Sequence, residues 1–430
     1  MKISELIKAT NATVFGEFNS NFEVQISTDT RTIQKGEIYL PLKGTTFDGE
    51  KFINQAFEKG AIGAFCTTSN ITEIQKNKLL LKVPDTLIAY LQLANHKRKK
   101  QDFFVVAVTG SSGKTTTKEI ISSTLSEKFK IFKTPLNYNN EIGLCQTIFA
   151  TPNDTEILIL EMGMRGLGEI ELLSKYAEPD ITVISNIGTA HIGRLGSREN
   201  IAKAKCEIVK HQRGDTFIAH DDELIKNTVN FNKEKIFYSI KDTEIIEKSI
   251  NYSKFKYENT IYELNVSGDY NIENALSAIN IGKKLGMSTE QIQNGLKKYK
   301  PIEKRWETIN AGGYEIINDS YNANPESMKA FVNTIFELYN DFLLVLGDMR
   351  ELGENEIQYH KELGEYIFKK NPNSKIITIG NLAKNIAEPN FETIEEATSY
   401  IKNNISNKTK IFLKASRSMK FEKIIEYLQN

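Results

Sequence analysis

The chain has 430 residues, of which 40% are hydrophobic and 26% are charged, and its 55 Lys and Arg balance its 55 Asp and Glu. This length is too great for a single hydrophobic core, so two or three domains are expected. The zero net charge gives no reason to expect a nucleic acid or an acidic membrane as a partner.

Residues 1–10 lack the apolar core of a signal peptide, and no hydrophobic run approaches the length of a membrane span. The cysteines Cys66, Cys145 and Cys206 have neither metal-binding nor redox spacing, so we interpret them as ordinary core thiols in a reducing compartment. The sequence therefore predicts a cytoplasmic protein, and since nothing in it indicates oligomerisation, we expect a monomer.

Residues 1–98 are predicted to form a small first α/β domain. One helix is expected at about 52–59 and another at 87–100, which ends in the basic run HKRKK and suits a linker. Short apolar strands are expected at 24–26, 38–42 and 62–66.

Residues 99–308 are predicted to form a central doubly wound α/β domain with a mainly parallel sheet, and residues 309–430 a third, Rossmann-like α/β domain. The central strands are near-continuous apolar runs, as buried parallel strands are, at 103–109, 157–161 and 181–186. The strands of the third domain are expected at 314–317, 342–346, 376–379 and 411–413. Ligands of such folds bind at the carboxyl ends of the strands, so polar residues there are candidates for the site.

In residues 105–119, VVAVTGSSGKTTTKE, an apolar strand runs directly into a Gly-rich turn and the start of a helix. Glycines allow backbone N–H groups to turn around an anion, and the helix start adds its positive dipole end. Lys114 is placed to reach the β- and γ-phosphates of a nucleotide, and Thr115 to bind Mg²⁺. Only two residues separate Gly110 from Gly113, so this is a shortened phosphate loop. The alternative, a turn that merely caps a helix, does not account for Gly-Lys-Thr at this junction.

Polar side chains follow the next two central strands. Glu161 ends the strand in LILEMGMRGLGEI, and His191 follows Asn186 in SNIGTAHIGRLGS. Since parallel strands end at one edge of a sheet, Thr115, Glu161 and His191 are expected to surround a phosphate, with Glu161 as an oxygen ligand for Mg²⁺. Taken alone, Glu161 would be a solvated loop carboxylate and His191 a loop histidine bonded to backbone.

Lys205, in RENIAKAKCEIVK, shares a helix face with Ile201, Ile208 and Val209, whereas Lys203 points elsewhere. A lysine within a buried face has a lowered pKa and can react as a neutral amine, and reaction with CO₂ would give a carbamate able to bind a second Mg²⁺. The alternative, a lysine whose ammonium reaches past the apolar face to water, is equally compatible with the sequence.

Asn271 and Asn274, in GDYNIENALSAI, lie early in a predicted helix. Asn274 either contacts a nucleobase or caps the helix, and the local sequence favours capping. In the third domain, polar loops follow three apolar strands, and their joint occurrence predicts a second ligand-binding edge that faces the phosphate loop. The polar residues of these loops are Asp319, Tyr321, Asn322, Asn324, Asp348, Glu351, Lys414, Ser416, Arg417 and Lys420.

Together these motifs closely resemble those of the Mur ligases of bacterial cell-wall synthesis. The phosphate loop, EMGMRGLGEI, SNIGTAHIGRLGSRENIAKAKCEI, NDSYNANPESM, LGDMRELG and LKASRSMKFE occur in the family's order over nearly the whole chain. The two-residue gap in the phosphate loop is itself typical of these ligases. One departure lies at Ala415 and Ser418, where glycines commonly flank Ser-Arg.

The resemblance implies ATP-dependent amide ligation through an acyl phosphate. The motifs are most similar to those of the member that joins D-Ala-D-Ala to UDP-MurNAc-tripeptide. The alternative is the preceding ligase, which adds the third amino acid, but its usual Asp-Asn-Pro-Arg motif does not occur in this sequence. Two alternative functions come from other classes: a P-loop motor, and a nucleotide-binding module without catalytic activity. Nothing resembles a motor's partner surface, and Lys114, Glu161 and His191 argue against a silent module.

The resemblance also implies roles for individual residues. The catalytic residues would be Lys114, His191, Lys205 and Arg305. ATP would be bound by Gly110, Ser111, Ser112, Gly113, Lys114, Thr115, Thr116, Asn274, Arg305 and Asp319. Mg²⁺, as two ions, would be held by Thr115, Glu161, His191 and carbamylated Lys205. The UDP group would contact Ser27, Thr28, Asp29, Arg31, Lys43, Gly44, Asp48 and Gly49. The acceptor side would be formed by Asn322, Asn324, Asp348 and Arg417.

Overall fold

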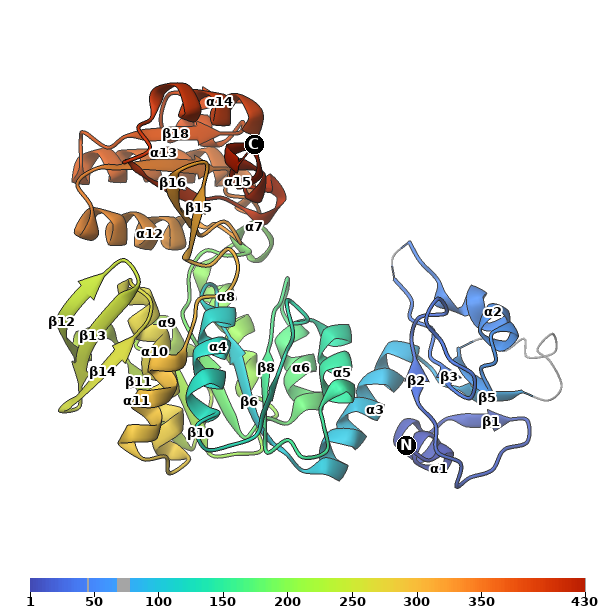
Figure 1. Cartoon of the computed structure of the whole chain (residues 1–430). Coiled ribbons are helices and arrows are strands. Elements are labelled where there is room, and N and C mark those ends of the chain that lie inside the picture. The colour runs from blue at the N-terminus through green and yellow to red at the C-terminus, as the bar shows by residue number, and fades with distance from the viewer. Residues whose placement is uncertain (45, 68–77, 430) are drawn as a thin grey trace. The chain divides into compact units, whose positions relative to one another are not determined.

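The computed structural model describes residues 1–44, 46–67 and 78–429. The chain divides into two compact units. The first unit contains Met1–Phe103 and Asn140–Asn153, and the second contains Phe104–Asn139 and Asp154–Asn430 (Figure 1). Both units combine helices with sheets, which confirms the predicted α/β class.

The first unit contains a mixed five-stranded sheet in the order β1-β5-β4-β3-β2, in which only β1 runs antiparallel to its neighbour. Its strands are β1 Thr13–Phe15, β2 Ile26–Ser27, β3 Ile38–Tyr39, β4 Gly63–Cys66 and β5 Leu79–Lys82. Its helices are α1 Ile3–Thr10, α2 Ile53–Glu58, α3 Thr86–Gln101 and α5 Glu141–Ala150. The strand predicted at 38–42 ends early because Pro41 has no N–H to donate to a neighbour.

The second unit begins with a six-stranded, all-parallel sheet in the order β11-β10-β9-β6-β8-β7. Its strands are β6 Phe104–Thr109, β7 Ile131–Lys133, β8 Ile157–Glu161, β9 Ile181–Ile184, β10 Thr216–His220 and β11 Glu234–Tyr238. Its helices are α4 Lys114–Leu125, α6 Glu169–Ala177, α7 Ile192–Leu195, α8 Arg198–Cys206, α9 Glu223–Thr228, α10 Asp269–Lys284 and α11 Thr289–Lys298. Because β6 lies between β8 and β9, the three strands expected to carry the site are neighbours, as predicted.

A small antiparallel sheet, which the sequence analysis did not anticipate, follows the parallel one. Its strands are β12 Thr243–Ser249, β13 Tyr252–Tyr257 and β14 Thr260–Leu264. In β13 the buried residues Ser253, Phe255 and Tyr257 alternate with more exposed ones. This alternation is the usual signal of a strand with one buried face, so the sequence did contain the evidence for it.

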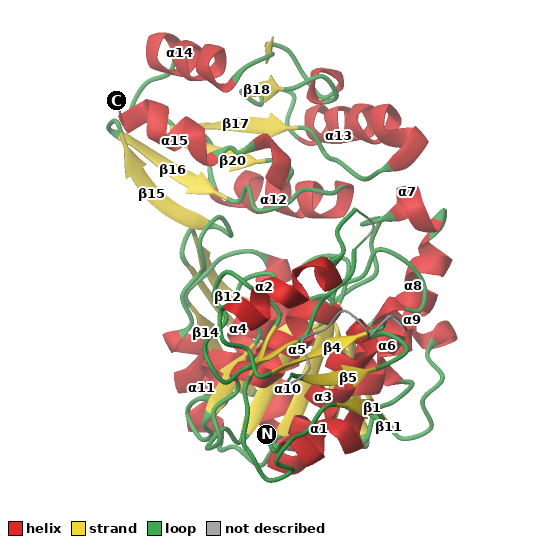
Figure 2. Ribbon diagram, turned by 90° about the vertical axis from the view of Figure 1, so that its right-hand side faces the viewer, coloured by secondary structure: helices red, strands yellow, loops and turns green. Residues whose placement is uncertain are grey.

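The chain ends with a six-stranded sheet in the order β15-β16-β20-β17-β18-β19, parallel except for β15. Its strands are β15 Glu307–Ala311, β16 Tyr314–Asn318, β17 Phe342–Gly347, β18 Ile376–Ile379, β19 Asn390–Phe391 and β20 Lys410–Lys414. Its helices are α12 Pro325–Leu338, α13 Glu356–Lys370, α14 Ile394–Asn404 and α15 Glu422–Gln429. Helices α12 and α13 cover one face and α14 and α15 the other (Figure 2).

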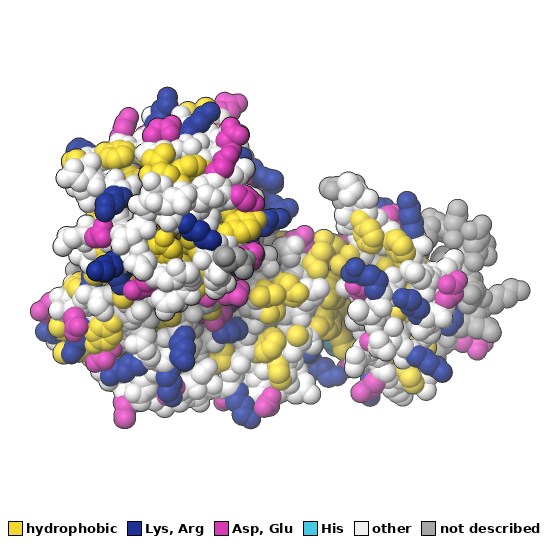
Figure 3. All heavy atoms as spheres, turned by 45° about the horizontal axis from the view of Figure 1, so that its top comes forward, with side chains coloured by type: hydrophobic (Ala, Val, Ile, Leu, Met, Phe, Trp, Pro, Cys, Tyr) yellow, Lys and Arg dark blue, Asp and Glu magenta, His cyan; other side chains and the backbone are white. Residues whose placement is uncertain are grey.

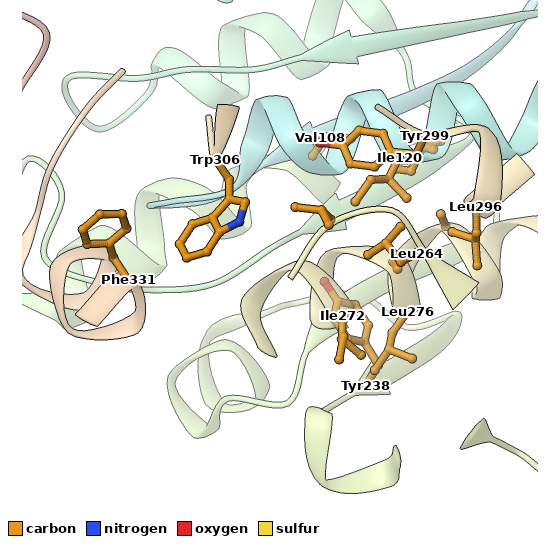
Figure 4. Close-up of a cluster of buried hydrophobic side chains, with 14 of the residues drawn as sticks. Val108, Ile120, Tyr238, Leu264, Ile272, Leu276, Leu296, Tyr299, Trp306 and Phe331 are labelled. Carbon is orange, nitrogen blue, oxygen red and sulfur yellow. The ribbon is translucent and has the colours of Figure 1, made fainter. Parts of the chain in front are cut away.

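One hydrophobic cluster extends through the second unit. Val108 of β6 and Ile120 of α4 belong to the same cluster as Trp306 and Phe331 (Figure 4). The Trp306 indole N–H donates to the carbonyl of Ile250, between β12 and β13, at 2.8 Å. Trp306, just before β15, is therefore packed in the same core as the central parallel sheet and bonded to the small β12–β14 sheet.

Acidic and basic side chains are interspersed over the visible surface, in keeping with the zero net charge (Figure 3). Cys66, Cys145 and Cys206 are buried and unpaired, as predicted. In the part of the chain that the structure describes, no helix has the length and apolarity needed to cross a membrane.

Candidate active site

The predicted phosphate loop connects β6 to α4, and its glycines are required by close contacts. A Cβ atom on Gly110 would lie 1.9 Å from the Ser185 Oγ, so no larger residue fits there. Gly113 precedes α4 with a left-handed φ of 78°. A Cβ on Gly113 would lie 2.9 Å from the Asn274 Oδ1. The loop therefore packs directly against the end of β9 and against α10.

Asn186, which follows β9, holds the loop in shape. Its carbonyl accepts from the Ser111 N–H at 3.1 Å, and its Oδ1 accepts from the Ser112 N–H at 2.9 Å. The Ser185 hydroxyl donates to the Ser112 carbonyl at 2.6 Å. Ser111, Thr115 and Thr116 are buried. The loop conformation is thus set by a neighbouring strand rather than by the loop sequence alone.

Lys114 and Lys205 both donate from Nζ to the Gly110 carbonyl, at 2.8 and 2.9 Å. Lys205 is only 1% exposed, whereas Lys203 is exposed, so Lys205 lies on the buried helix face and its ammonium does not reach water. Burial, together with the charge of Lys114, lowers the pKa of Lys205 well below its usual value. Burial and Arg305 also lower the pKa of Lys114, although Glu161 opposes them.

Glu161 lies at the end of β8 and is 4% exposed. Its Oε1 accepts from the Asn139 Nδ2 at 2.9 Å. Its Oε2 is buried, has no hydrogen-bond partner among the described residues and lies 3.6 Å from the Lys118 Nζ. A buried carboxylate oxygen with an open coordination position fits a magnesium ligand.

His191 precedes α7 with a left-handed φ of 67°. Its Nδ1 lies 2.9 Å from the Oε2 of Glu351, so its partner is a carboxylate and not backbone. Burial and the charges of Lys114 and Lys205 lower the pKa of His191, outweighing the effect of Glu351.

The proposed metal ligands are of several chemical types: a carboxylate, an imidazole, a hydroxyl and a carbamate. Among residues 1–44, 46–67 and 78–429, no three His, Cys, Asp or Glu side chains group together as a metal site. Glu161 and His191 therefore need other donors, and the remaining predicted ligands are the Thr115 hydroxyl and a carbamate on Lys205. Both residues are buried at the phosphate loop.

Arg305 meets Thr115 directly. Its Nη2 donates to the Thr115 Oγ1 at 2.8 Å, and its guanidinium lies 3.9 Å from the centre of the Tyr321 ring. The buried Nε of Arg305 has no hydrogen-bond partner within the described residues. A cation therefore lies beside the start of α4 with a donor still available.

Asn274 does not cap its helix, so the locally favoured interpretation was wrong. Helix α10 begins at Asp269 with Gly268 as its N-cap, which places Asn274 in the second turn. Its Oδ1 accepts from the Thr117 hydroxyl at 3.0 Å, beside Gly113. The position is set by packing of α10 against α4.

Two predicted residues of the last sheet have well-defined partners. Asp319 forms an ion pair with Lys414 and accepts from the backbone N–H of Trp306 at 3.2 Å. Asn324 caps α12 with its Oδ1, and its Nδ2 donates to the Ser112 hydroxyl at 2.8 Å. Asn324, which was assigned to the acceptor side, thus contacts the phosphate loop.

Asp348 has no exposed surface, and its Oδ1 accepts from the backbone N–H groups of Leu382 and Ala383 at 3.0 and 2.8 Å. Its carboxylate organises a turn of the last domain, and its Oδ2 pairs with Arg350 at 2.7 Å, so the assignment of Asp348 to the acceptor side stays a prediction. Asn322 and Arg417 are exposed and remain available to a ligand.

The predicted UDP-binding residues of the first unit follow β2 and β3. The Ser27 Oγ accepts from the Asp29 N–H at 3.3 Å, and Thr28, between these two residues, is partly buried. Asp29 also forms an ion pair with Arg31 at 2.6 Å. The Arg31 guanidinium holds the pKa of Asp29 at about 2.

The second of these loops follows β3. Lys43 lies 3.7 Å from Asp48, and the Gly44 N–H donates to the Phe47 carbonyl at 2.8 Å. A Cβ on Gly49 would lie 2.6 Å from the Leu42 carbonyl oxygen, so glycine is required at this position.

Family models match three parts of the chain. The Mur ligase family catalytic domain matches residues 24–98, the Mur ligase middle domain residues 108–282, and the Mur ligase glutamate ligase domain residues 304–417. The UDP-N-acetylmuramoyl-tripeptide–D-alanyl-D-alanine ligase of Bacillus subtilis is 37% identical over 99% of this chain and 97% of its own length. The chain belongs to the Mur ligase family.

Further members of the family agree with this assignment. The enzyme of the same name from Synechocystis is 32% identical over 94% of this chain and 91% of its own length. A crystal structure of MurF from Acinetobacter baumannii has a TM-score of 0.89 and 28% identity, covering 100% of this chain and 98% of that one. MurF from Thermotoga maritima, solved in complex with ADP, has a TM-score of 0.86 and 26% identity, covering 94% and 97%.

In this Mur ligase, the structure adds three residues that the sequence analysis did not single out. Lys118 and Asn139 contact the Glu161 carboxylate, and Glu326 accepts from the Thr189 hydroxyl at 2.8 Å. Lys118 follows Lys114 by one helical turn, which was the available signal. No comparable signal in the sequence indicates Asn139 or Glu326, because their partners are distant in the chain.

Proposed function

We propose that this Mur ligase joins D-alanyl-D-alanine to UDP-N-acetylmuramoyl-tripeptide, converting ATP to ADP and phosphate. The observation that carries the proposal is near-full-length similarity to the Bacillus subtilis ligase that bears this activity in its name. The ADP complex of the Thermotoga maritima relative supports ATP as the nucleotide.

We assign a substrate to each predicted domain. Residues 1–98 bind the UDP group, residues 99–308 bind ATP, and residues 309–430 bind the dipeptide. The first assignment uses the loops after β2 and β3, with Asp29 and Arg31 available to diphosphate or ribose. A cytoplasmic location and a monomeric state stay predictions of the sequence.

The chemistry proceeds in two transfers. A terminal carboxylate oxygen of the tripeptide attacks the γ-phosphorus of ATP, the bond to the β-phosphate oxygen breaks, and ADP leaves. The amine of D-Ala-D-Ala then attacks the carbonyl carbon of the acyl phosphate and loses a proton, and the tetrahedral intermediate expels phosphate. Both steps bring anionic oxygens together, so positioned cations provide most of the catalysis.

Lys114 and Arg305 are the cations that this chain supplies. Lys114 lies at the first residue of α4, and Arg305 donates to the Thr115 hydroxyl at 2.8 Å. In the ATP complex, Lys114 leaves the Gly110 carbonyl for the β- and γ-phosphate oxygens, while the N–H groups at the start of α4 donate to the β-phosphate.

The oxygen-rich edge fits Mg²⁺, which when bound neutralises the phosphate oxygens and polarises the phosphorus. Glu161, with its open Oε2, and Thr115 would hold the ion. His191 and carbamylated Lys205 would complete a second position. We propose that the neutral Lys205 amine adds to CO₂ with loss of one proton, because two ammonium groups on one carbonyl repel each other.

The test is phosphate release by the purified protein with Mg-ATP and UDP-MurNAc-tripeptide, comparing D-Ala-D-Ala with single amino acids. We expect release that depends on the dipeptide, with a UDP-linked pentapeptide as product. Release with a single amino acid on a shorter UDP-linked peptide would assign the protein to the preceding step. Release without any acceptor would overturn the ligase proposal in favour of an ATPase.

A further inference from the structure

Glu207 is a buried carboxylate to which the proposed reaction assigns no role. It begins a 3₁₀ turn, Glu207–Val209, that continues α8 two residues beyond Lys205. It is 6% exposed. Both of its oxygens accept from the Gly168 N–H, at 2.9 and 3.0 Å, and its Oε2 also accepts from the Glu171 N–H at 3.3 Å.

These contacts make Glu207 the cap of a helix to which it does not belong. Helix α6 follows Gly168, which has no side chain to cap the first N–H groups. Within the described residues, Glu207 forms no ion pair, so the helix N–H groups and the positive end of the helix dipole are its main stabilisation. Burial raises the pKa of this carboxyl in spite of those bonds.

The two segments that Glu207 joins are those that carry the proposed metal ligands. Gly168 closes the loop that begins at Glu161, at the end of β8. Lys205 precedes Glu207 on the same continuous helical segment and reaches the Gly110 carbonyl. The hydrogen bonds between Glu207 and Gly168 span 39 residues of sequence. A single side chain thus links the Glu161 loop to the Lys205 helix.

We propose that Glu207 is a positioning residue that sets the distance between the Glu161 loop and the Lys205 helix, and thereby prepares the magnesium site. The inference rests on the proposed function, since that function defines the ligands. Removing a residue that orients metal ligands without binding the metal itself typically lowers the metal affinity by roughly 10–100-fold. Glu207 acts in this way without touching substrate.

A second contact between the same elements supplies a matched control. The Ser174 hydroxyl, in the second half of α6, donates to the Ile208 carbonyl at 2.7 Å. Ser174 is fully buried, so its loss also weakens the packing of α6 on this turn. It lies away from Gly168, however, and leaves the Glu161 loop attached. Ser174→Ala therefore reports the effect of general loosening.

The experiment measures binding of Mn²⁺ to the full-length protein with ADP, from the electron paramagnetic resonance signal of free Mn²⁺. Glu207→Ala is expected to raise the Mn²⁺ dissociation constant about tenfold or more, and Ser174→Ala to leave it unchanged. Amide hydrogen exchange of residues 163–171 should be faster in Glu207→Ala. Glu207→Gln should weaken Mn²⁺ binding several-fold, because its NH₂ group faces an N–H donor.

Wild-type Mn²⁺ affinity in folded Glu207→Ala would overturn the proposal, and so would an equal loss in Ser174→Ala. If Glu207→Ala does not fold, unchanged affinity in Glu207→Gln overturns it instead. Ligation by the wild-type protein is measured separately. A wild-type protein that binds Mn²⁺ with ADP but ligates nothing would contradict the proposed function and leave the role of Glu207 in the metal site supported.

Discussion

The two candidate nucleotide sites of this chain are built in opposite ways. In the first unit, the predicted UDP-binding side chains bond to one another within the loop, Ser27 with Asp29 and Asp29 with Arg31, each two residues apart. In the central sheet, Lys205 reaches Gly110 across 95 residues, and Arg305 reaches Thr115 across 190. The contacts among the predicted binding side chains are therefore local in the first site and tertiary in the second.

The two sites also differ in how far their charged groups are exposed to water. The Arg31 side chain is 87% exposed, so water screens its pairing with Asp29. Lys205 is 1% exposed, and there burial changes its chemistry by favouring the neutral amine. Exposed local pairs are suited to binding a charged ligand, whereas buried distant ones can create a reactive group.

The largest effect is expected from removing the phosphate-loop lysine. Lys114→Ala should reduce ligation by roughly 10³-fold, the scale of losing one preorganised charge at a transition state. The fold should be retained, because the Lys114 Nζ contributes only one hydrogen bond, to Gly110. Phosphate release and circular dichroism are the measurements. Near-normal ligation by this variant would remove Lys114 from the site.

Lys205→Ala should reduce activity by roughly 10²-fold, and a short-chain carboxylic acid added to the assay should restore part of it. The acid would take the place of the carbamate in the space left by the side chain. Lys203→Ala is the matched control, because it removes an exposed lysine of the same helix. Full activity of Lys205→Ala without any addition would exclude the carbamate.

Asp29→Asn tests the exposed, local site. We expect the KM for the UDP-linked substrate to rise roughly tenfold, the scale of one charge-assisted hydrogen bond, with kcat and thermal stability unchanged. The reason is that Asp29 orients Arg31 but carries little of the folding free energy. Glu58→Gln, on the exposed side of α2, serves as control. A lower Tm with an unaltered KM would show a structural role instead.

The smallest effect is a pH dependence of stability. His360 is fully buried, its Nε2 accepts from the Met349 N–H at 2.9 Å, and burial lowers its pKa. The neutral ring therefore stabilises the fold above the ordinary histidine pKa of about 6.5, and this is lost as the pH falls through the lowered value. The Tm measured by thermal unfolding should therefore be a few degrees lower at pH 5.5 than at pH 7.5.

The pH dependence of the Tm also distinguishes buried from exposed ionisable groups. His360→Gln should reduce the difference between the two pH values, whereas His211→Gln, which changes a partly exposed histidine, should retain it. Asp29 should not contribute, because its pKa of about 2 keeps it ionised throughout this range. An unchanged pH dependence in His360→Gln would assign the effect to another group.

Much of the fold and part of the site could be predicted from single segments. The apolar runs gave the central strands within a few residues, since buried parallel strands need continuous hydrophobic sequence. Helix periodicity placed Lys205 on the face of Ile201, Ile208 and Val209, but only the structure decided that its ammonium is buried and does not reach water. The small sheet β12–β14 was not predicted, because its strands have only one buried face and lack the continuous apolar runs of the central strands.

The undecided cases concern polar side chains whose partners are distant in sequence. The local sequence favoured a cap over a nucleobase contact for Asn274, but packing of α10 on α4 turned its side chain toward Thr117. Asp348 was assigned to the acceptor side, and the structure adds that its Oδ1 accepts from the backbone N–H groups of Leu382 and Ala383. A local sequence cannot distinguish these cases, because a carboxylate or amide is satisfied equally well by backbone or by ligand.

The sequence by itself determined the α/β class, the phosphate loop and the strand ends that carry Glu161 and His191, since these depend on hydrophobic periodicity and on residue types at one junction. Only the tertiary structure decided that Lys114 and Lys205 share the Gly110 carbonyl and that Glu207 joins the Glu161 loop to the Lys205 helix. The physical reason is that burial and long-range hydrogen bonds, which set the charge state and orientation of these groups, exist only once distant segments pack together.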